Sequence, residues 1–397
     1  MKITIHRGAR QIGGVIVEIS TDANRVFIDI GDDLPGTEST FFSGIAGLTN
    51  GDPVGSVLFL THYHNDHIGR LSKVLPDVPV YMGETAKKLL LNLIEIIDED
   101  GLPGYEKIIT FKAAEKIAVG GITVTPLMVD HSAFDAYMFI VEADGKRVLH
   151  TGDFRTHGFR GSKTAKMLSV YAKDIDYMIS EGTMLSRTDN AVITEYELQK
   201  DAAEIMRENK YAFALCSSTN IDRVAAFYHA SRAAGRLFVC DHYQARQLET
   251  VRDAHAEKSS LYDFKNIYTV GNYKNVPVKL LDYMDDKGFC MLIRKGDKWK
   301  PYLERFGDSL VIIYSMWTGY LRDKTADKEL VDFLSQYPFV ELHTSGHATA
   351  EALKEIYDTV NPKGGLIPFH SEKPMVFKSL IGEENVILLS DGEVFEA

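Results

Sequence analysis

The chain has 397 residues, which is enough for two or three domains with a large apolar core. Its formal net charge of -12 argues against indiscriminate binding to polyanions, because Lys and Arg supply most non-specific affinity for nucleic acids. A nuclease is not excluded, since bound metal ions bring positive charge to a site. No apolar run approaches the roughly 20 residues of a membrane span, and the N-terminus enters a strand pattern without a signal-like segment. A soluble cytoplasmic protein is expected.

The opening of the chain predicts three short strands that form a meander. Residues 3–5, 15–19 and 26–30 alternate or run apolar, with Gly13-Gly14 and residues 22–24 between them. The third strand carries Asp29 near its end. An Asp at the end of a strand often caps the turn that follows it, and this reading of Asp29 stays open.

The next feature is a turn rich in metal-binding side chains. It carries His62, His64, Asp66 and His67 directly after the apolar run 57–60, so a buried strand delivers the turn into the open. Imidazole and carboxylate groups suit zinc and its first-row neighbours, and four such groups crowd a single ion. We therefore expect two ions, one served by His62 and His64 and the other by Asp66 and His67. The order H-x-H-x-D-H-x-G resembles that of the metallo-β-lactamase superfamily, and a polar surface loop is the alternative.

Further strands and one helix follow this turn. The pattern predicts strands at 79–81, 108–111, 122–128, 137–141, 148–150 and 176–180, and a helix at 84–98. His131, Asp153 and Glu181 each stand just after one of these strands. The pattern then changes to alternating helix and strand: helices at 194–208, 221–233, 244–257 and near 325–336, and strands at 211–216, 236–240, 288–293 and 310–314. Such alternation is typical of an α/β domain with a largely parallel sheet.

The last part of the chain returns to histidine-rich strand ends. A strand at 339–343 leads into His343-Thr344-Ser345-Gly346-His347-Ala348 and a helix at 349–360. A strand at 364–369 ends in His370, and a closing strand is expected at 386–389. Because candidate site residues occupy both ends of the sequence, we expect a discontinuous first domain, 1–190 and 339–397, with an inserted domain at 191–338.

These motifs together resemble the β-CASP branch of the metallo-β-lactamase fold. The form H-x-S-G-H-A at 343–348 is similar to that of the RNase J ribonucleases, and the resemblance covers nearly the whole chain. It implies an α/β fold with a four-layer αββα metallo-β-lactamase domain and an inserted α/β β-CASP domain. The chain ends soon after the last motif, so the further C-terminal domain of full-length RNase J proteins is not expected.

The resemblance implies a role for each matching position. The first metal would be bound by His62, His64 and His131, the second by Asp66, His67 and His370, with Asp153 bridging both. Asp29 would orient the metal turn through hydrogen bonds. Asp66, Glu181 and His347 would take part in catalysis. His347 would help to protonate the leaving oxygen or stabilise the scissile phosphate, and Glu181 would orient His347. Two zinc ions are expected, with manganese as the second choice.

The segment 343–348 would bind a phosphate of the RNA, including a 5′ monophosphate, through His343, Ser345, Gly346, His347 and Ala348. A helix begins just after it, and exposed backbone N–H groups at a helix start favour an anion. Simple capping of that helix by Ser or Thr is the alternative. Trp317 and Tyr320 could stack on bases, although burial of both rings in the core is the favoured expectation.

The function expected is hydrolysis of phosphodiester bonds in single-stranded RNA, as a 5′-exoribonuclease with endonuclease activity also open. Three alternatives remain: a nuclease for DNA, a hydrolase for a thioester, lactone or cyclic nucleotide, and a non-catalytic RNA-binding protein. A redox di-iron protein is disfavoured, because relatives of that kind carry Glu where His64 stands. Oligomer formation is left open.

Overall fold

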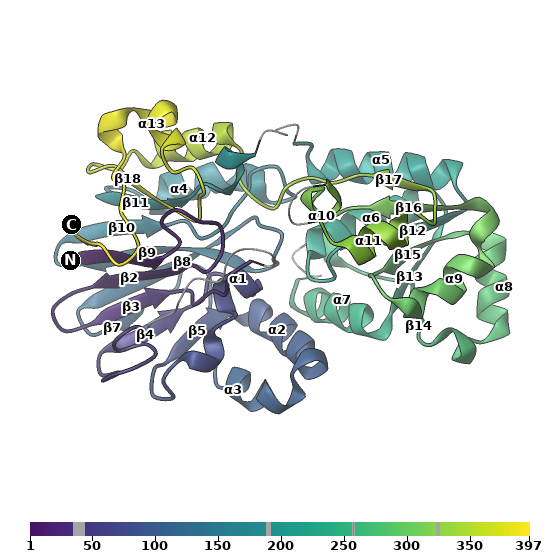
Figure 1. Cartoon of the computed structure of the whole chain (residues 1–397), viewed down its shortest axis with the longest axis horizontal. Coiled ribbons are helices and arrows are strands. Elements are labelled where there is room, and N and C mark those ends of the chain that lie inside the picture. Colours follow the sequence, from purple (N-terminus) through teal and green to yellow (C-terminus); the bar gives the residue numbers. More distant parts are fainter. Residues whose placement is uncertain (35–43, 188–191, 256, 258, 323–325) are drawn as a thin grey trace. The chain divides into compact units, whose positions relative to one another are not determined.

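The computed structural model describes residues 1–34, 44–187, 192–255, 257, 259–322 and 326–397 (Figure 1). Contacts divide the chain into unit 1, residues 1–191 and 346–397, and unit 2, residues 192–345. The expected boundary at 190/191 lies outside the described residues. The chain returns to unit 1 at Gly346, whereas the sequence pattern set this return at residue 339. In the described parts, no helix is long and apolar enough to cross a membrane.

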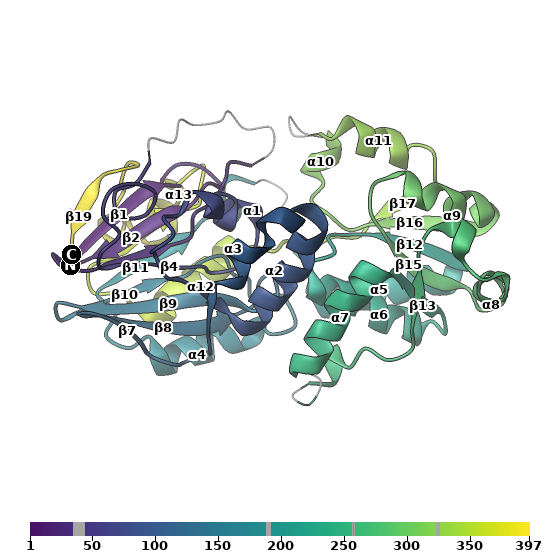
Figure 2. The ribbon, with the colours of Figure 1, turned by 90° about the horizontal axis from the view of Figure 1, so that it is seen from below.

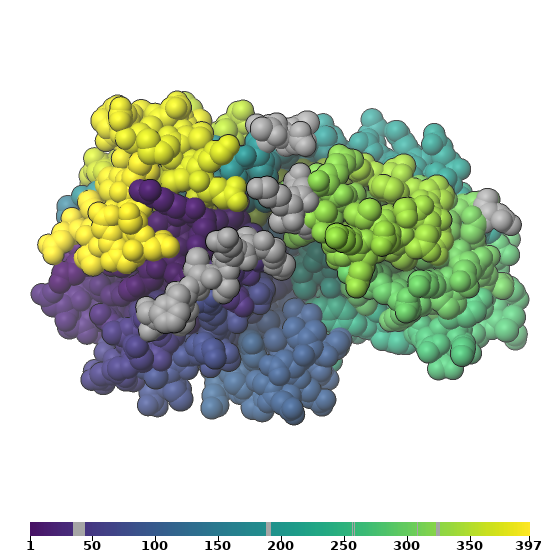
Figure 3. Space-filling model, in the orientation of Figure 1, coloured from purple at the N-terminus to yellow at the C-terminus, as the bar shows by residue number. Residues whose placement is uncertain are grey.

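The first sheet of unit 1 has seven strands among the described residues. Their order is β19 (Val394–Glu396), β1 (Lys2–Arg7), β2 (Ile16–Ser20), β3 (Arg25–Ile28), β4 (Ser56–Phe59), β5 (Val80–Gly83) and β6 (Ile109–Phe111). Strands β1 to β3 form an antiparallel meander, and β3 to β6 are parallel. Strand β19 pairs with β1, so residues near the two ends of the chain lie side by side on the surface (Figure 3).

The second sheet of unit 1 has six strands in the described residues. Their order is β18 (Leu366–Phe369), β11 (Tyr177–Glu181), β10 (Lys146–His150), β9 (Ala136–Ala143), β8 (Ile122–Val129) and β7 (Ile117–Val119). Strands β18, β11 and β10 are parallel, although residues 182–365 separate β11 from β18 in the sequence. The chain that forms unit 2 is therefore inserted between two neighbouring strands.

The two sheets pack face to face through a continuous apolar core (Figure 2). Ile28 and Phe59 from the first sheet meet Phe139 and Phe369 from the second, and all four are fully buried. The rings of Phe59 and Phe139 pack edge to face with centroids 5.5 Å apart. Burial of rings of this size is a major source of stability in such a core.

Helices flank the two sheets of unit 1, and the shortest of them, α1, belongs to the turn after β4. They are α1 (Asn65–Ile68), α2 (Glu84–Ile97), α3 (Leu102–Glu106), α4 (Thr164–Tyr171), α12 (Ala350–Val360) and α13 (Val376–Ile381). Leu168 of α4 and Leu353 of α12 join the core on the outer face of the second sheet, while α2 packs beside β5 and β6. The first turn of α2 is capped from a distance, because Oδ2 of Asp135 accepts hydrogen bonds from the backbone N–H groups of Thr85 and Ala86, each at 2.9 Å.

Among the described residues, unit 2 is an α/β unit with a parallel six-stranded sheet. The strand order is β14 (Ile267–Val270), β13 (Leu237–Asp241), β15 (Phe289–Ile293), β12 (Tyr211–Leu215), β16 (Leu310–Tyr314) and β17 (Phe339–Glu341). Its helices are α5 (Glu195–Glu208), α6 (Ile221–Ala233), α7 (His242–His255), α8 (Val278–Lys287), α9 (Lys300–Arg305), α10 (Gly319–Arg322) and α11 (Lys328–Leu334). A capping box of Thr194 and Glu197 starts α5.

Some expectations differ from the structure. The closing strand predicted at 386–389 is wrong: Val386 makes a single bridge to Leu366, and the last strand is β19. Burial of Trp317 and Tyr320 in the core is also wrong, since Trp317 is half-buried and Tyr320 is 38% exposed. The helix expected near 325–336 spans Lys328–Leu334, and residue 325 lies outside the described residues. The elements that were not predicted include helices α1, α3, α4, α8, α9, α10 and α13 and strands β7 and β14.

Candidate metal centre

The histidine-rich turn follows the parallel strand β4, whose buried residues fix where the turn begins. A short helix, α1, then closes the turn, with the backbone N–H groups of His67 and Ile68 donating to the carbonyl of His64 at 3.0 Å. This bend turns the side chains of 62–67 towards one another. His62 and His67 are fully buried, and His64 is half-buried.

His62, His64 and His131 form one cluster of ring nitrogens, all within 4.8 Å of one another. Nε2 of His62 lies 3.1 Å from Nδ1 of His64, and Nε2 of His131 lies 3.3 Å from the same atom. Burial lowers the pKa of His62 and His131 well below the usual value and lowers the pKa of His64 to about 4, so the three rings are neutral. Three converging neutral imidazoles are the donor set of a zinc-like ion.

Hydrogen bonds behind two of these rings leave Nε2 free to face the cluster. Nδ1 of His131 lies 2.7 Å from the carbonyl of Gly346, which can only accept, so this nitrogen carries the proton. Nδ1 of His62 lies 3.0 Å from Oγ1 of Thr61, whose hydroxyl donates to Asp29 at 2.7 Å. The unprotonated Nε2 atoms can therefore ligate a metal.

A second cluster contains Asp66, His67 and His370, again within 4.8 Å. Nε2 of His370 lies 3.3 Å from Oδ2 of Asp66, and its Nδ1 lies 2.8 Å from the hydroxyl of Thr183. Burial disfavours the charged form of His67, yet the carboxylates of Asp153, Asp29 and Asp66 raise its pKa well above the usual value. Three carboxylates around one ring therefore favour positive charge at this place.

Asp153 lies between the two clusters. Its Oδ2 is 3.1 Å from Nε2 of His67 and 4.0 Å from Nε2 of His62, and its Oδ1 is 3.7 Å from Nδ1 of His370. Burial opposes its charge, but His370, His67 and His347 hold its pKa well below the usual value. Among the described residues, no donor forms a hydrogen bond with its buried Oδ1. A buried carboxylate oxygen without a donor is a feature that a bound cation would explain.

Asp29 lies directly beneath the turn. Its Oδ1 accepts from the backbone N–H of Thr61 at 2.7 Å, and its Oδ2 accepts from the hydroxyl of Thr61 at 2.7 Å and from Nδ1 of His67 at 2.8 Å. Burial raises the pKa of this carboxyl, and the contacts with His67 and Thr61 lower it only in part. These contacts run to the metal turn, 32 and 38 residues further along the chain.

Glu181 and His347 stand beside Asp153. Nδ1 of His347 lies 3.3 Å from each oxygen of Glu181 and 3.6 Å from Oδ2 of Asp153. Burial favours neutral His347, but the two carboxylates raise its pKa, so the ring holds its proton more firmly than a free imidazole. The side chain is 18% exposed, whereas Glu181 is fully buried.

The segment 343–348 is held at both ends. His343 and Ser345 belong to unit 2, where Nη2 of the buried Arg223 donates to the carbonyl of Thr344 at 2.9 Å. The backbone N–H of Ala348 in unit 1 donates to Oε1 of Glu181 at 3.3 Å, and Thr349 caps α12. The amide of Ala348, which was expected to face a phosphate, is therefore used within the chain. For His343, Ser345 and Gly346 phosphate binding stays a prediction.

Two residues next to the site were missed from the sequence. Asp130 and Arg155 are both fully buried, and Nε of Arg155 donates to Oδ1 of Asp130 at 2.7 Å. Asp130 precedes His131, and Arg155 follows Asp153 by two residues, so the pair joins the two loops that carry these side chains. Their spacing from the two motifs was the available signal, but charged residues are usually exposed.

One protein family and several known proteins are similar to this chain. The family described as "Beta-lactamase superfamily domain" matches residues 24–210. The chain is similar to Ribonuclease J of Mycoplasma genitalium, 23% identical over 423 residues that cover 99% of this chain and 73% of the relative. It is also similar to Ribonuclease J of Helicobacter pylori (strain B128), 24% identical over 432 residues that cover 100% of this chain and 60% of the relative. The superfamily match is confined to residues 24–210, and the chain is RNase J-like over nearly its whole length.

Two further similarities extend the comparison of this RNase J-like chain. The DNA cross-link repair protein pso2/snm1 of Schizosaccharomyces pombe is 35% identical over 101 residues, 24% of this chain and 17% of that protein. The crystal structure of a protein of unknown function from Enterococcus faecalis V583 matches with a TM-score of 0.75 and 21% identity, covering 99% of each chain. The expected fold class and the expectation of a metal-dependent hydrolase are confirmed. The metallo-β-lactamase fold implies the use of divalent metal ions.

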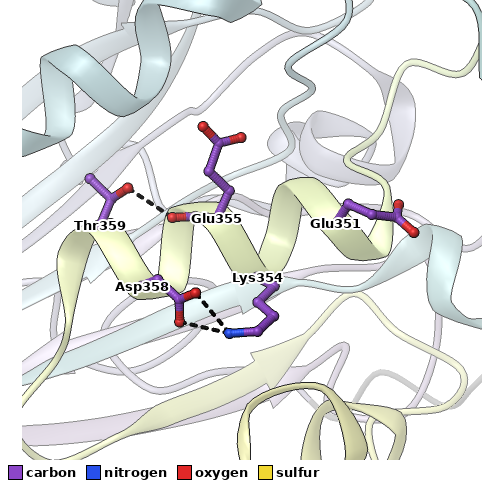
Figure 4. A pocket seen from close by; sticks show the side chains of 5 residues that line it. All are labelled: Glu351, Lys354, Glu355, Asp358 and Thr359. Atoms are coloured by element: carbon purple, nitrogen blue, oxygen red, sulfur yellow. Dashed lines mark hydrogen bonds and ion pairs between the residues drawn. The ribbon is translucent and has the colours of Figure 1, made fainter.

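One surface depression of the RNase J-like chain lies apart from these residues. It is lined by Glu351, Lys354, Glu355, Asp358 and Thr359, all on the outer face of α12 (Figure 4). Nζ of Lys354 pairs with Asp358 at 2.7 Å, and the hydroxyl of Thr359 donates to the carbonyl of Glu355 at 2.8 Å. A single helix supplies the whole lining, and no expected site residue belongs to it.

Proposed function

We propose that this chain is a two-metal nuclease that hydrolyses phosphodiester bonds of single-stranded RNA, with release of nucleotides from the 5′ end favoured over internal cleavage. The observation that carries the proposal is the pair of His/Asp clusters in contact with Asp153, with Glu181 and His347 beside them. The similarity to Ribonuclease J over nearly the whole chain supports RNA as the substrate. The proposal includes zinc as the resident ion, with manganese second, and a cytoplasmic location.

The ligand assignment follows the two clusters. The first ion would be held by His62, His64 and His131, and the second by Asp66, His67 and His370. Asp153 would contact both. When bound, two divalent ions neutralise charge on the phosphate and lower the pKa of a water molecule that attacks phosphorus. Asp29 and Thr61 fix the tautomers of His62 and His67 that this binding requires.

His347 would deliver the proton to the leaving oxygen. Its Nδ1 lies 3.3 Å from Glu181 and 3.6 Å from Asp153 and can donate its proton to a carboxylate. Burial disfavours the charged ring, but the carboxylates of Glu181 and Asp153 raise its pKa above the usual value. As the bond between phosphorus and the leaving oxygen breaks, Nε2 can supply the proton that this oxygen takes up. Glu181 then serves as a positioning residue, because its two oxygens hold the ring in place.

A phosphate of the RNA would bind near residues 343–348. In this proposal Ser345, Gly346 and His343 make the contact, whereas the amide of Ala348 donates to Glu181. A 5′ monophosphate held there would make cleavage depend on the state of the 5′ end. This is the property that separates exonucleolytic from internal cleavage in the experiment below.

A nuclease for single-stranded DNA is the second candidate. It is favoured by the 35% identity to a DNA cross-link repair protein, although this match covers only 24% of the chain. The metal clusters would act on either backbone, because the phosphodiester is common to both polymers. Discrimination requires a contact to the 2′-hydroxyl.

The test uses one single-stranded sequence made as RNA and as DNA, each with a 5′ phosphate or a 5′ hydroxyl, and cleavage read on a denaturing gel. Zinc- or manganese-loaded protein is compared with His64→Ala. Mononucleotides from 5′-phosphorylated RNA, absent with the variant, are the expected result. Faster cleavage of both DNA substrates would favour the second candidate. No metal-dependent cleavage of any of the four would overturn the nuclease proposal.

A further inference from the structure

We propose that Trp317 and Tyr320 form a base-stacking platform in unit 2 that holds single-stranded nucleic acid. The inference deepens the proposed function and rests on it. The two rings lie edge to face, with centroids 5.4 Å apart and an interplanar angle of 79°. Trp317 is half-buried and Tyr320 is 38% exposed. Such rings offer flat faces to bases of any sequence, which is how non-specific single-strand binders hold their ligands.

The platform is rigidly built. The hydroxyl of Tyr314 donates to the carbonyl of Trp317 at 2.9 Å, and the backbone N–H of Tyr320 donates to the same carbonyl at 3.2 Å. The carbonyl of Tyr320 in turn accepts from the backbone N–H of Asp327 at 2.9 Å. Because the backbone carrying both rings is fixed before any ligand arrives, stacking on it costs little conformational entropy.

Gly319 allows the ring of Trp317 to lie where it does. A Cβ atom added at Gly319 would stand 2.3 Å from Cζ2 and 2.4 Å from Cη2 of the indole, closer than any real contact. The ring therefore rests against bare backbone on this side and is held at a fixed orientation. Any side chain at position 319 would displace the indole and separate the pair.

The platform stands at the carboxyl edge of the unit 2 sheet. Strand β16 ends at Tyr314, which is paired in parallel register with Glu341 of β17. The backbone N–H of Leu342 donates to the carbonyl of Tyr314 at 2.9 Å, and the hydroxyl of Ser315 donates to the carbonyl of Leu342 at 2.5 Å. Trp317 therefore leaves the sheet at the edge where the chain passes into the 343–348 segment. Carboxyl edges of open α/β sheets are where ligands commonly bind.

The charges around the rings suggest what kind of binding to expect. Arg322 follows Tyr320 by two residues and is 62% exposed at its side chain, but it pairs with Glu341. The whole chain has a formal net charge of -12. With the charge of Arg322 already compensated by Glu341, stacking should contribute more to binding here than phosphate neutralisation by this arginine. The affinity should consequently depend only weakly on salt, unlike that of binders that make many phosphate contacts.

The test measures binding without turnover. The full chain with His64→Ala is titrated onto a fluorescein-labelled RNA of about 12 nucleotides, and the dissociation constant is read from anisotropy. We expect Trp317→Ala and Tyr320→Ala each to weaken binding about 5- to 150-fold, the range that stacking of one base gives. Trp317→Phe should keep most of the affinity. Tyr283→Ala is the matched control, since Tyr283 is also an exposed tyrosine of unit 2, 39% exposed on α8.

A strand with the same backbone and abasic positions supplies the second readout. It should bind the parent and Trp317→Ala with equal affinity. Between about 50 and 200 mM salt the affinity of the parent for intact RNA should change less than about tenfold, whereas 6–10 phosphate contacts would give 10³–10⁵. Equal binding of intact RNA by the parent and both Ala variants, or absence of binding by the parent, would overturn the platform.

The outcomes for the platform and for the nuclease proposal remain distinguishable. RNA cleavage by the wild type together with unchanged affinity in the Ala variants would overturn the platform alone. Binding that depends on both rings, without cleavage by the metal-loaded wild type, would overturn the nuclease proposal and support the platform.

Discussion

Replacement of Asp29 by Asn tests whether the buried carboxylate sets the metal affinity of the turn. The change keeps the shape of the side chain and replaces one oxygen by an NH₂ group. If this group takes the place of Oδ2, it meets the N–H at Nδ1 of His67, which lies 2.8 Å away. If it takes the place of Oδ1, it meets the backbone N–H of Thr61 at 2.7 Å. Two donors then face each other in either orientation.

The first orientation has a direct consequence for metal binding. His67 can avoid the clash by moving its proton to Nε2, but Nε2 is the atom that faces Asp153 and would ligate the second ion. Loss of a carboxylate behind a metal-binding histidine typically costs 10- to 100-fold in metal affinity, which is about 1.4–2.7 kcal/mol. We expect a loss of this size for the second ion and a smaller one for the first, which Asp29 reaches only through Thr61.

The assay is competition for zinc with a chromogenic chelator, which resolves the two binding steps. Asp22→Asn is the matched control, because Asp22 is 96% exposed in the same unit. Circular dichroism before titration shows whether the variant is folded. Unchanged affinity for both ions in folded Asp29→Asn would refute the argument that this carboxylate fixes the tautomer of His67.

Four further predictions follow from the described contacts. Removal of metal by a chelator should lower the melting temperature of unit 1 in calorimetry. An ion present at 100 times its Kd stabilises the folded state by about 2.7 kcal/mol, so an unchanged melting temperature would contradict metal binding. Asp135→Ala should cost about 1–3 kcal/mol in urea unfolding by uncapping α2, with metal content unchanged. Arg155→Met should lower the free energy of unfolding of metal-free protein by about 3–5 kcal/mol, because it leaves the charge of Asp130 buried without its arginine. Adding Asp130→Asn to this variant should restore part of the lost stability. Burial opposes the charge of Asp241, but Arg294 and Lys298 more than offset this effect and lower its pKa below the usual value of 3.8. The charged carboxylate should therefore stabilise unit 2 above pH 3.8, and this stabilisation should be lost as the pH falls through the lowered pKa. Asp241→Asn should flatten this dependence in urea unfolding.

The strands that carry the site could be predicted from the sequence because buried strands consist of runs of apolar residues. The run 57–60 is apolar throughout, as expected for a strand covered on both faces, and β4 spans Ser56–Phe59. Strand β19 could not be read in this way. Val394 is 55% exposed and the strand pairs with β1 at the edge of the sheet, so its place depends on a partner at the other end of the chain. The apolar stretch at 386–389 was the stronger pattern, yet it forms only a bridge.

The contacts that the sequence did not predict are ion pairs and hydrogen bonds between buried polar groups that lie far apart in the chain. Nothing local distinguishes the buried Arg155 from an exposed arginine, because its burial depends on Asp130, 25 residues away. The amide of Ala348 looked free for an anion at a helix start until the structure placed Glu181 beside it. Trp317 and Tyr320 show the opposite case, since aromatic rings are usually buried and the fold leaves these two at a sheet edge.

The order of strands explains how an insertion of this size leaves the site intact. Asp153, Glu181 and His370 come from the carboxyl ends of β10, β11 and β18, which are neighbours in parallel register. The backbone pairing of Glu181 with Phe369 fixes His370 beside Glu181, whatever length of chain lies between them. The opposite sheet does the same with β3 and β4, whose parallel ends bring Asp29 beneath Thr61. Because both sheets present these strand ends on the same side of the core, the geometry of the ligands depends on sheet register and not on unit 2. Substitutions within unit 2 should therefore leave the metal affinity unchanged, which competition for zinc would show.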